Sequence, residues 1–63
     1  MSTFWNPGVS VRLKIGGPAM TVVGQYSVPA GKLKGKQMVK CTWIDADGHQ
    51  QTGEFPPDAL VPA

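Results

Sequence analysis

The feature that most restricts the fold is the stretch Gly16-Gly17-Pro18, which stands between two runs of residues suited to extended backbone. From Val9 to Ile15, apolar residues alternate strictly with serine, arginine and lysine. Such alternation is typical of a half-buried β-strand, and a helix does not tolerate this break in its interior. Glycine reaches positive φ freely, so the chain can reverse direction here. The pattern predicts two neighbouring antiparallel strands, over 9–15 and 20–26, that face one core.

Two further strands follow, joined by a hairpin turn. The alternation over residues 37–44 places three side chains on one predicted inner face: Val39, Cys41 and Trp43. The Asp-Ala-Asp-Gly sequence at 45–48 predicts the turn, with Asp47 and Gly48 suited to positive φ. Residues 49–55 then predict a polar strand with one exposed face.

Glycine and proline define the remaining segments. Gly24 lies inside the second predicted strand, which indicates a β-bulge or a sharp bend. Residues 27–36 have the composition of a long flexible loop. Residues 56–60 contain too much proline to continue a sheet, so they predict a single tight helical turn before a short closing strand at 60–61.

The fold class that follows is all-β: a small five-stranded SH3-like barrel with a single helical turn before the last strand. Residues 1–7 are expected to form an N-terminal extension, and residues 8–63 a single barrel domain. A chain of 63 residues buries only about 60% of its unfolded surface, so its stability is marginal. The single cysteine, Cys41, excludes an internal disulfide, which keeps association of identical copies open as an alternative support.

Charge and hydropathy restrict the setting and the partners. No stretch reaches the roughly 18 apolar residues of a membrane span, and no secretion signal is visible. Together with the lone thiol, this predicts a cytoplasmic protein without membrane contact. The formal net charge of +2 is too small to imply nucleic acid by itself. Three lysines nevertheless cluster in one predicted loop, at positions 32, 34 and 36, and all four acids follow later in the chain.

The order of several rare residue types resembles a known family. "GGPAMTVVG", then "MVKCTWIDADG", then "EF" and "LVPA" are similar to the YodC-like family of small bacterial proteins. The resemblance extends over residues 9–63, and the stretch "PAGKLKGK" is longer and more basic than is usual there. It implies a small SH3-like cytoplasmic protein of bacterial or phage origin, and it implies no biochemical activity.

A weaker similarity concerns the opening strands. "GVSVRLKIGG" followed by "TVVGQY" resembles the plasmid-borne type II dihydrofolate reductases, which are SH3-like tetramers. Their valine-glutamine-isoleucine-tyrosine pore motif is absent, because the corresponding region reads "QQTGEFPPDAL". An oligomeric pore enzyme is therefore a remote alternative.

Two groups of residues are candidates for chemical sites. Asp45, Asp47 and His49 alternate as metal ligands can, but aspartates in a turn have a sufficient role in forming it. Cys41 lies on the predicted inner face, where a thiol packs as a small hydrophobe and is not activated as a nucleophile. We expect no metal, no cofactor and no catalytic residue.

The candidate binding residues lie at the loops and rim. Trp5 and Tyr26 flank predicted strands, and an exposed aromatic ring is a natural anchor for a partner; packing over one barrel end is the alternative for Trp5. The lysine cluster could follow phosphates, extended by Arg12, Lys14 and Lys40 if these share a face. The predicted partner-binding residues are Trp5, Tyr26, Lys32, Lys34, Lys36 and Arg12. The sequence thus predicts a non-enzymatic module that binds a protein partner, with nucleic-acid binding through the basic loop as the alternative.

Overall fold

The computed structural model describes residues 4–63, so positions 1–3 of the expected N-terminal extension lie outside the described residues. Its elements are the strands β1 (Ser10–Leu13), β2 (Met20–Ser27), β3 (Gln37–Ile44) and β4 (Gln50–Phe55), the 3-10 turn η1 (Pro57–Ala59), and β5 (Leu60–Pro62). No α-helix occurs between residues 4 and 63. The predicted all-β class and the single helical turn before the last strand are confirmed.

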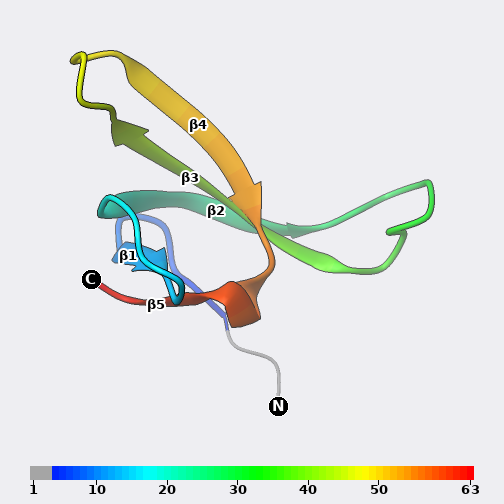
Figure 1. The fold of residues 1–63 in the computed structure, drawn as a ribbon. Helices are drawn as coiled ribbons and strands as arrows, with labels where there is room; N and C mark the ends of the chain where they lie inside the picture. Colours follow the sequence, from blue (N-terminus) through cyan, green and yellow to red (C-terminus); the bar gives the residue numbers. More distant parts are fainter. Residues whose placement is uncertain (1–3) are drawn as a thin grey trace.

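The strands form one antiparallel sheet in the order β4-β3-β2-β1-β5. This is the strand order of an SH3-like barrel, in which the first strand lies between the second and the last. β2 and β3 are the longest strands, with eight residues each, and they curve across the molecule (Figure 1). The two edges of the sheet are therefore β4 and β5.

The glycine-glycine-proline break joins β1 to its antiparallel neighbour β2, as predicted. Gly16 and Gly17 have φ values of +105° and +133°, which side chains rarely allow. The first strand is shorter than predicted, because the Gly16 N–H already donates to the Leu13 carbonyl and starts the turn there. Ile15 consequently lies outside the strand with 94% of its surface exposed, and the prediction that it faces the core was wrong.

Two further glycines act largely as predicted. The pairing of β2 with β3 shifts register between Val22 and Gly24, so the predicted bulge is confirmed. In the β3–β4 turn, the Gly48 N–H donates to the Asp45 carbonyl, and Gly48 has a φ of +82°. Asp47 does not take positive φ, contrary to prediction, since across residues 4–63 only glycines do. One glycine suffices to close this four-residue turn.

The core is small and lies where the sheet curls over itself. Its buried members come from every strand except β4: Val11, Met20, Val22, Val39, Cys41 and Leu60. Trp43 and Phe55 pack against it as half-buried rings, with centroids 6.1 Å apart. Gly53 lies beneath them, since a Cβ there would come within 3.0 Å of the Phe55 ring. The inward orientation predicted for Cys41 is confirmed.

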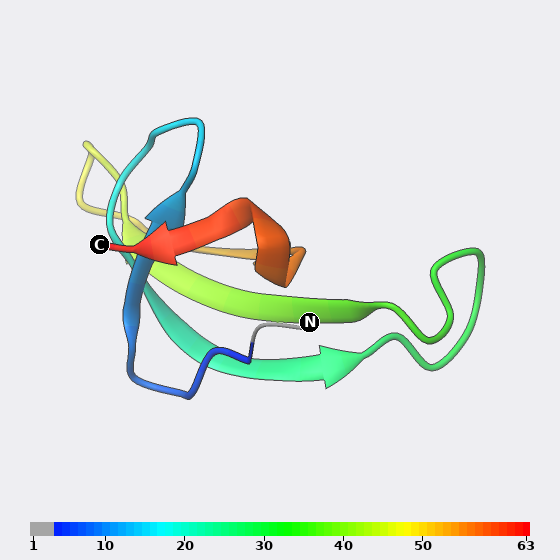
Figure 2. The same ribbon diagram turned by 90° about the horizontal axis from the view of Figure 1, so that it is seen from below.

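The β2–β3 hairpin continues beyond this core. Seen from below, its far half projects away from β1, β5 and η1, and its tip is the part of the molecule most distant from them (Figure 2). The inner face of this far half is polar, since Gln25, Ser27 and Gln37 occupy positions that would otherwise hold core residues. The molecule thus consists of a packed barrel body and a polar hairpin arm.

Candidate functional site

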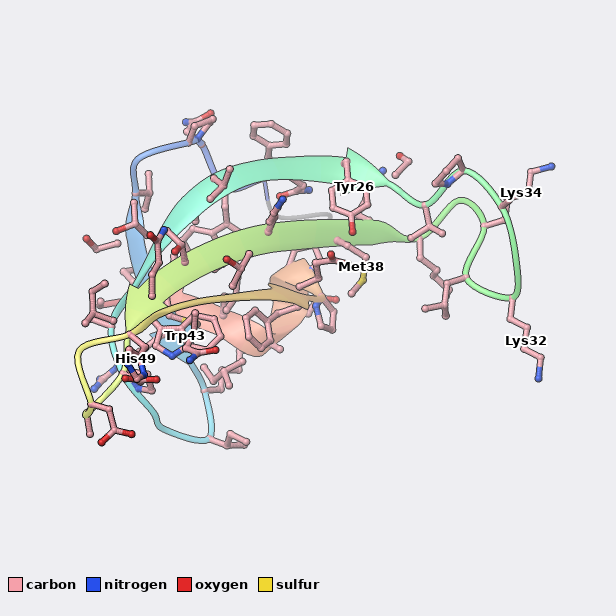
Figure 3. The ribbon with its side chains drawn as sticks, turned by 90° about the horizontal axis from the view of Figure 1, so that it is seen from above. Tyr26, Lys32, Lys34, Met38, Trp43 and His49 are labelled. Carbon is pink, nitrogen blue, oxygen red and sulfur yellow. The ribbon has the colours of Figure 1, made fainter. Side chains whose placement is uncertain are left out.

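The sequence-predicted binding residues that come together do so on the β2–β3 hairpin. Tyr26 and Met38 are cross-strand partners near the end of the two strands, and the lysines follow at the tip (Figure 3). We call this set the hairpin surface; it consists of Tyr26, Lys32, Leu33, Lys34, Lys36 and Met38.

The tip of the hairpin is shaped by backbone hydrogen bonds. The Val28 N–H donates to the Lys36 carbonyl and the Gly35 N–H to the Val28 carbonyl, each at 2.9 Å. Two tight turns follow each other between them, closed by bonds from Lys34 to Gly31 and from Lys36 to Leu33. Apart from Ser27, which ends β2, the segment 27–36 is a loop as predicted, and two turns shape its backbone.

The side chains at the tip combine charge with one apolar group. Lys32, Lys34 and Lys36 are all exposed, and Leu33 between them has 53% of its surface in solvent. Figure 3 shows Lys32 and Lys34 directed away from the barrel, at the opposite end of the molecule from His49 and the β3–β4 turn. That turn carries Asp45 and Asp47, so these two acids lie at the opposite end of the molecule from the lysines of the tip.

Tyr26 links the arm to the barrel body. Its hydroxyl donates to the Glu54 carboxylate of β4 at 2.6 Å, across the outer face of β3. The hydrogen bond to Glu54, with some burial and the negative charge of the carboxylate, raises the pKa of Tyr26 above 10.0. The ring lies beside Met38 and stays partly exposed, so it contributes apolar surface where the arm begins.

Trp5 lies on the other side of the sheet. Its backbone N–H donates to Gln25 Oε1 at 2.9 Å, and its indole N–H donates to the Pro57 carbonyl at 3.1 Å. Gln25 and Tyr26 are consecutive residues of one strand, so their side chains point to opposite faces. Trp5 packs half-buried against the core, and the structure does not bring it together with Tyr26.

Arg12 is also separate from the lysines. It lies in the middle of β1, paired with Val61 of β5, whereas the arm projects away from both strands. Lys40 lies on the outer face of β3 opposite Glu54 in β4. The extended basic patch considered from the sequence is therefore not assembled, and the exposed lysines of the tip stand apart.

The residues weighed for metal binding form a turn. Potential ligand atoms of Asp45, Asp47 and His49 lie within 4.8 Å of one another. The Asp45 carboxylate accepts the backbone N–H groups of Asp47 and His49 and the side-chain amide of Gln51. These bonds, led by that from His49, lower the pKa of Asp45 below 3.8. These bonds give the Asp45 carboxylate a role in forming the turn, as the sequence indicated.

Cys41 has the environment of a packing residue. It is fully buried, and burial raises the pKa of its thiol. A nucleophilic thiol needs the opposite, namely exposure and a lowered pKa.

The structure contains a shallow depression that the sequence did not predict. It lies between the end of β3 and the start of β2. It is open to solvent and is lined by Ala19, Thr21, Thr42, Trp43, Ile44 and Gln50. Its polar lining consists of hydroxyl and amide groups without a titratable side chain. Only the register of three strands brings these residues together, so no local pattern could have revealed it.

Comparison with known proteins places the chain in a family. Within residues 4–63, no helix has the length and apolar character needed to cross a bilayer. A search of curated proteins and a search of solved structures each give no match. The family described as "Uncharacterized small protein (DUF2158)" matches residues 7–60, which include four of the five strands completely and the start of β5. The chain therefore belongs to this family of small proteins.

Proposed function

We propose that this protein is a non-enzymatic binding module that contacts a protein partner through the hairpin surface. The observation that carries the proposal is the exposed Leu33 among three lysines, on a tip whose backbone is already hydrogen-bonded into shape. A preformed tip loses little conformational entropy when a partner docks, which favours binding.

The composition of the surface supports a protein as the partner. Protein interfaces combine an apolar centre with a polar rim and are enriched in tyrosine and methionine. The hairpin surface has Leu33 at its tip, Tyr26 and Met38 at its base, and lysines around them. The lysines favour a partner with an acidic surface, because opposite potentials steer association. A nucleic-acid groove would instead place aromatic rings among the cations, and the tip has none.

The wider setting belongs to the same proposal. The residues that resemble the YodC-like family support assignment to that group within the uncharacterised family, and with it a bacterial or phage origin and a cytoplasmic location. No partner is implied by this assignment.

The test compares capture of proteins from an extract of the source organism by four variants of the chain. The variant Lys32→Ser/Lys34→Ser/Lys36→Ser removes the charge of the tip, and Arg12→Ser/Lys14→Ser/Lys40→Ser removes equal charge elsewhere. Leu33→Ser removes the apolar group of the tip, and Ile15→Ser removes an apolar group at another site that is even more exposed to solvent. We expect a partner that the two control variants retain and the two tip variants lose.

A second arm measures binding of duplex and single-stranded nucleic acid at two salt concentrations. Neutralising three phosphates of a duplex would give a slope of log K against log salt of about −2.7. A slope of that size, with no dependence on Leu33, would overturn the proposal in favour of a nucleic-acid binder. Equal capture of a partner by all four variants would overturn the role of the hairpin surface.

A further inference from the structure

The two edges of the sheet are protected to different degrees. β5 has three residues, and Pro62 offers no N–H to another strand. β4 has six residues and contains no proline. Its one charged residue, Glu54, is bound by Tyr26 on the outer face of the sheet. Exposed edges of this kind pair with other strands unless charge, proline or a covering segment prevents it.

The alternation of hydrogen-bonded pairs along β3 and β4 shows which backbone groups of β4 are free to bond a further strand. The Asp45 N–H donates to the His49 carbonyl, and hydrogen-bonded and non-hydrogen-bonded pairs alternate along an antiparallel ladder. Gln50, Thr52 and Glu54 therefore form non-hydrogen-bonded pairs with β3, opposite Ile44, Thr42 and Lys40 respectively. Their N–H and C=O groups point away from the sheet, and within residues 4–63 no other strand pairs with them.

We infer that β4 pairs antiparallel with β4 of a second copy of this chain, in a register centred on Thr52. In this register Thr52 meets Thr52 of the second copy, and Gln50 meets Glu54 in both directions. All the paired residues are those whose backbone groups point outward, so each pair can exchange both of its N–H···O bonds. A two-fold interface of this type repeats every contact and closes on itself.

The side chains of β4 match in the same register. Gln50, Thr52 and Glu54 all lie on the outer face, because alternate residues share a face. Gln50 Nε2 donates one hydrogen to Thr42 Oγ1 and can donate its other hydrogen to the Glu54 carboxylate across the interface. Tyr26 binds that carboxylate through Oε2, so Oε1 remains as an acceptor. A register centred on Glu54 would instead place two carboxylates opposite each other, which is destabilising. The register centred on Thr52 pairs all three residues whose backbone groups point outward, and it places a donor opposite the carboxylate.

Paired cysteines test the register. Residues in a hydrogen-bonded antiparallel pair have Cα atoms about 5.5 Å apart, within the range that a disulfide spans. Under mild oxidation, Thr52→Cys is expected to form a covalent dimer. Gln50→Cys and Glu54→Cys alone are expected to give none, and an equimolar mixture of the two is expected to form the mixed dimer. The native Cys41 is buried, so the wild-type protein is expected to form no cross-link and serves as the control.

Failure of Thr52→Cys to cross-link, or equal cross-linking by Gln50→Cys or Glu54→Cys alone, would overturn the register. A separate measurement on the unmodified chain tests the pairing itself. Hydrogen exchange at the amides of Gln50, Thr52 and Glu54 is expected to slow as protein concentration rises from micromolar to millimolar, in step with dimer formation by sedimentation. Exchange at these amides that is independent of concentration would overturn the pairing.

A charge variant provides the matched control. Thr52→Lys places two lysines opposite each other at the centre of the interface and is expected to weaken dimerisation by about fivefold or more. Thr21→Lys makes the same change on an exposed residue of the interior strand β2 and is expected to leave dimerisation unchanged. Equal dimerisation by both variants would contradict the proposal. The hairpin surface includes no residue of β4, so the outcome is independent of the proposed function.

Discussion

The barrel body and the hairpin arm are built from the same two strands, yet different forces hold them. In the body, β2 and β3 contribute Met20, Val22, Val39 and Cys41 to an apolar core. In the arm, the corresponding inner positions hold Gln25, Ser27 and Gln37, which hydrogen-bond to one another. The body is stabilised by apolar burial, and this stabilisation is roughly proportional to the apolar area removed from water. The arm is held by hydrogen bonds: cross-strand pairing, the bond from Tyr26 to Glu54, and the bond from Trp5 to Gln25.

Because of this difference, we expect the body to determine stability and the arm to determine partner binding. Substitutions in the body act on folding, because a closely packed core responds to changes of a single methyl group. Substitutions at the tip of the arm touch no core residue and can change the surface offered to a partner without changing stability. The predictions below test how sharp this division is.

The largest expected effect is in the body. Leu60→Ala removes a buried side chain of β5 that closes the core, and we expect a loss of about 2–5 kcal/mol in the free energy of unfolding. Urea denaturation measures this loss, with Ile15→Ala as the control on an apolar residue outside the core. A loss below about 0.5 kcal/mol, the range of surface substitutions, would show that β5 is not part of the folded unit.

The next effect concerns the packing of the two rings at the edge of the body. Gly53→Val places side-chain atoms where Trp43 and Phe55 already meet, and overpacking of this kind costs about 1–3 kcal/mol. Thermal denaturation measures it, compared with Thr52→Val on the outer face of the same strand. If the two variants are equally stable, the rings are free to move aside and the body is looser than the core suggests.

In the arm, charge removal is expected to have little effect on folding. Lys32→Ser/Lys34→Ser/Lys36→Ser should change the free energy of unfolding by no more than about 0.5 kcal/mol, because all three side chains are exposed. Urea denaturation of this variant beside the wild-type chain gives the answer. A large loss would mean that the tip supports the body, and the division between the regions would fail.

The smallest expected effect is at the junction of the two regions. The hydrogen bond to Glu54 favours the protonated hydroxyl of Tyr26 and so raises its pKa. The contribution of this bond to stability is therefore present below the ordinary tyrosine pKa and is lost as pH rises through the raised pKa. Glu54→Gln should therefore shift the titration of Tyr26 to lower pH. Tyrosinate absorbance follows this residue alone, because the chain has one tyrosine. Identical titration in both proteins would show that the arm is not bonded to β4.

Local patterns in the sequence predicted most of the fold. The range 37–44 agrees with β3 at both ends, because alternation and turn residues mark it on each side. Ile15 was misplaced because alternation continues past the residue at which the glycine turn begins. The composition of 27–36 indicated a flexible loop, and the backbone bonds of its two turns could not be read from glycine content.

The candidate site was only partly predictable for a similar reason. The lysines and Tyr26 could be chosen by residue type, and the hairpin brings them onto one arm. The bond from Tyr26 to Glu54 depends on the register of β2, β3 and β4 together, and the bond from Trp5 to Pro57 joins residues 52 positions apart. Contacts of this range follow from tertiary structure and leave no local pattern.

The double attachment of Trp5, to Gln25 at the root of the arm and to Pro57 of η1, has an optical consequence. The chain's other indole, Trp43, packs against the core beside Phe55, away from the arm. A ligand that bends the arm would alter the fluorescence of Trp5 and leave that of Trp43 unchanged. The chain thus contains its own intrinsic probe of docking, with an internal reference, and needs no attached dye.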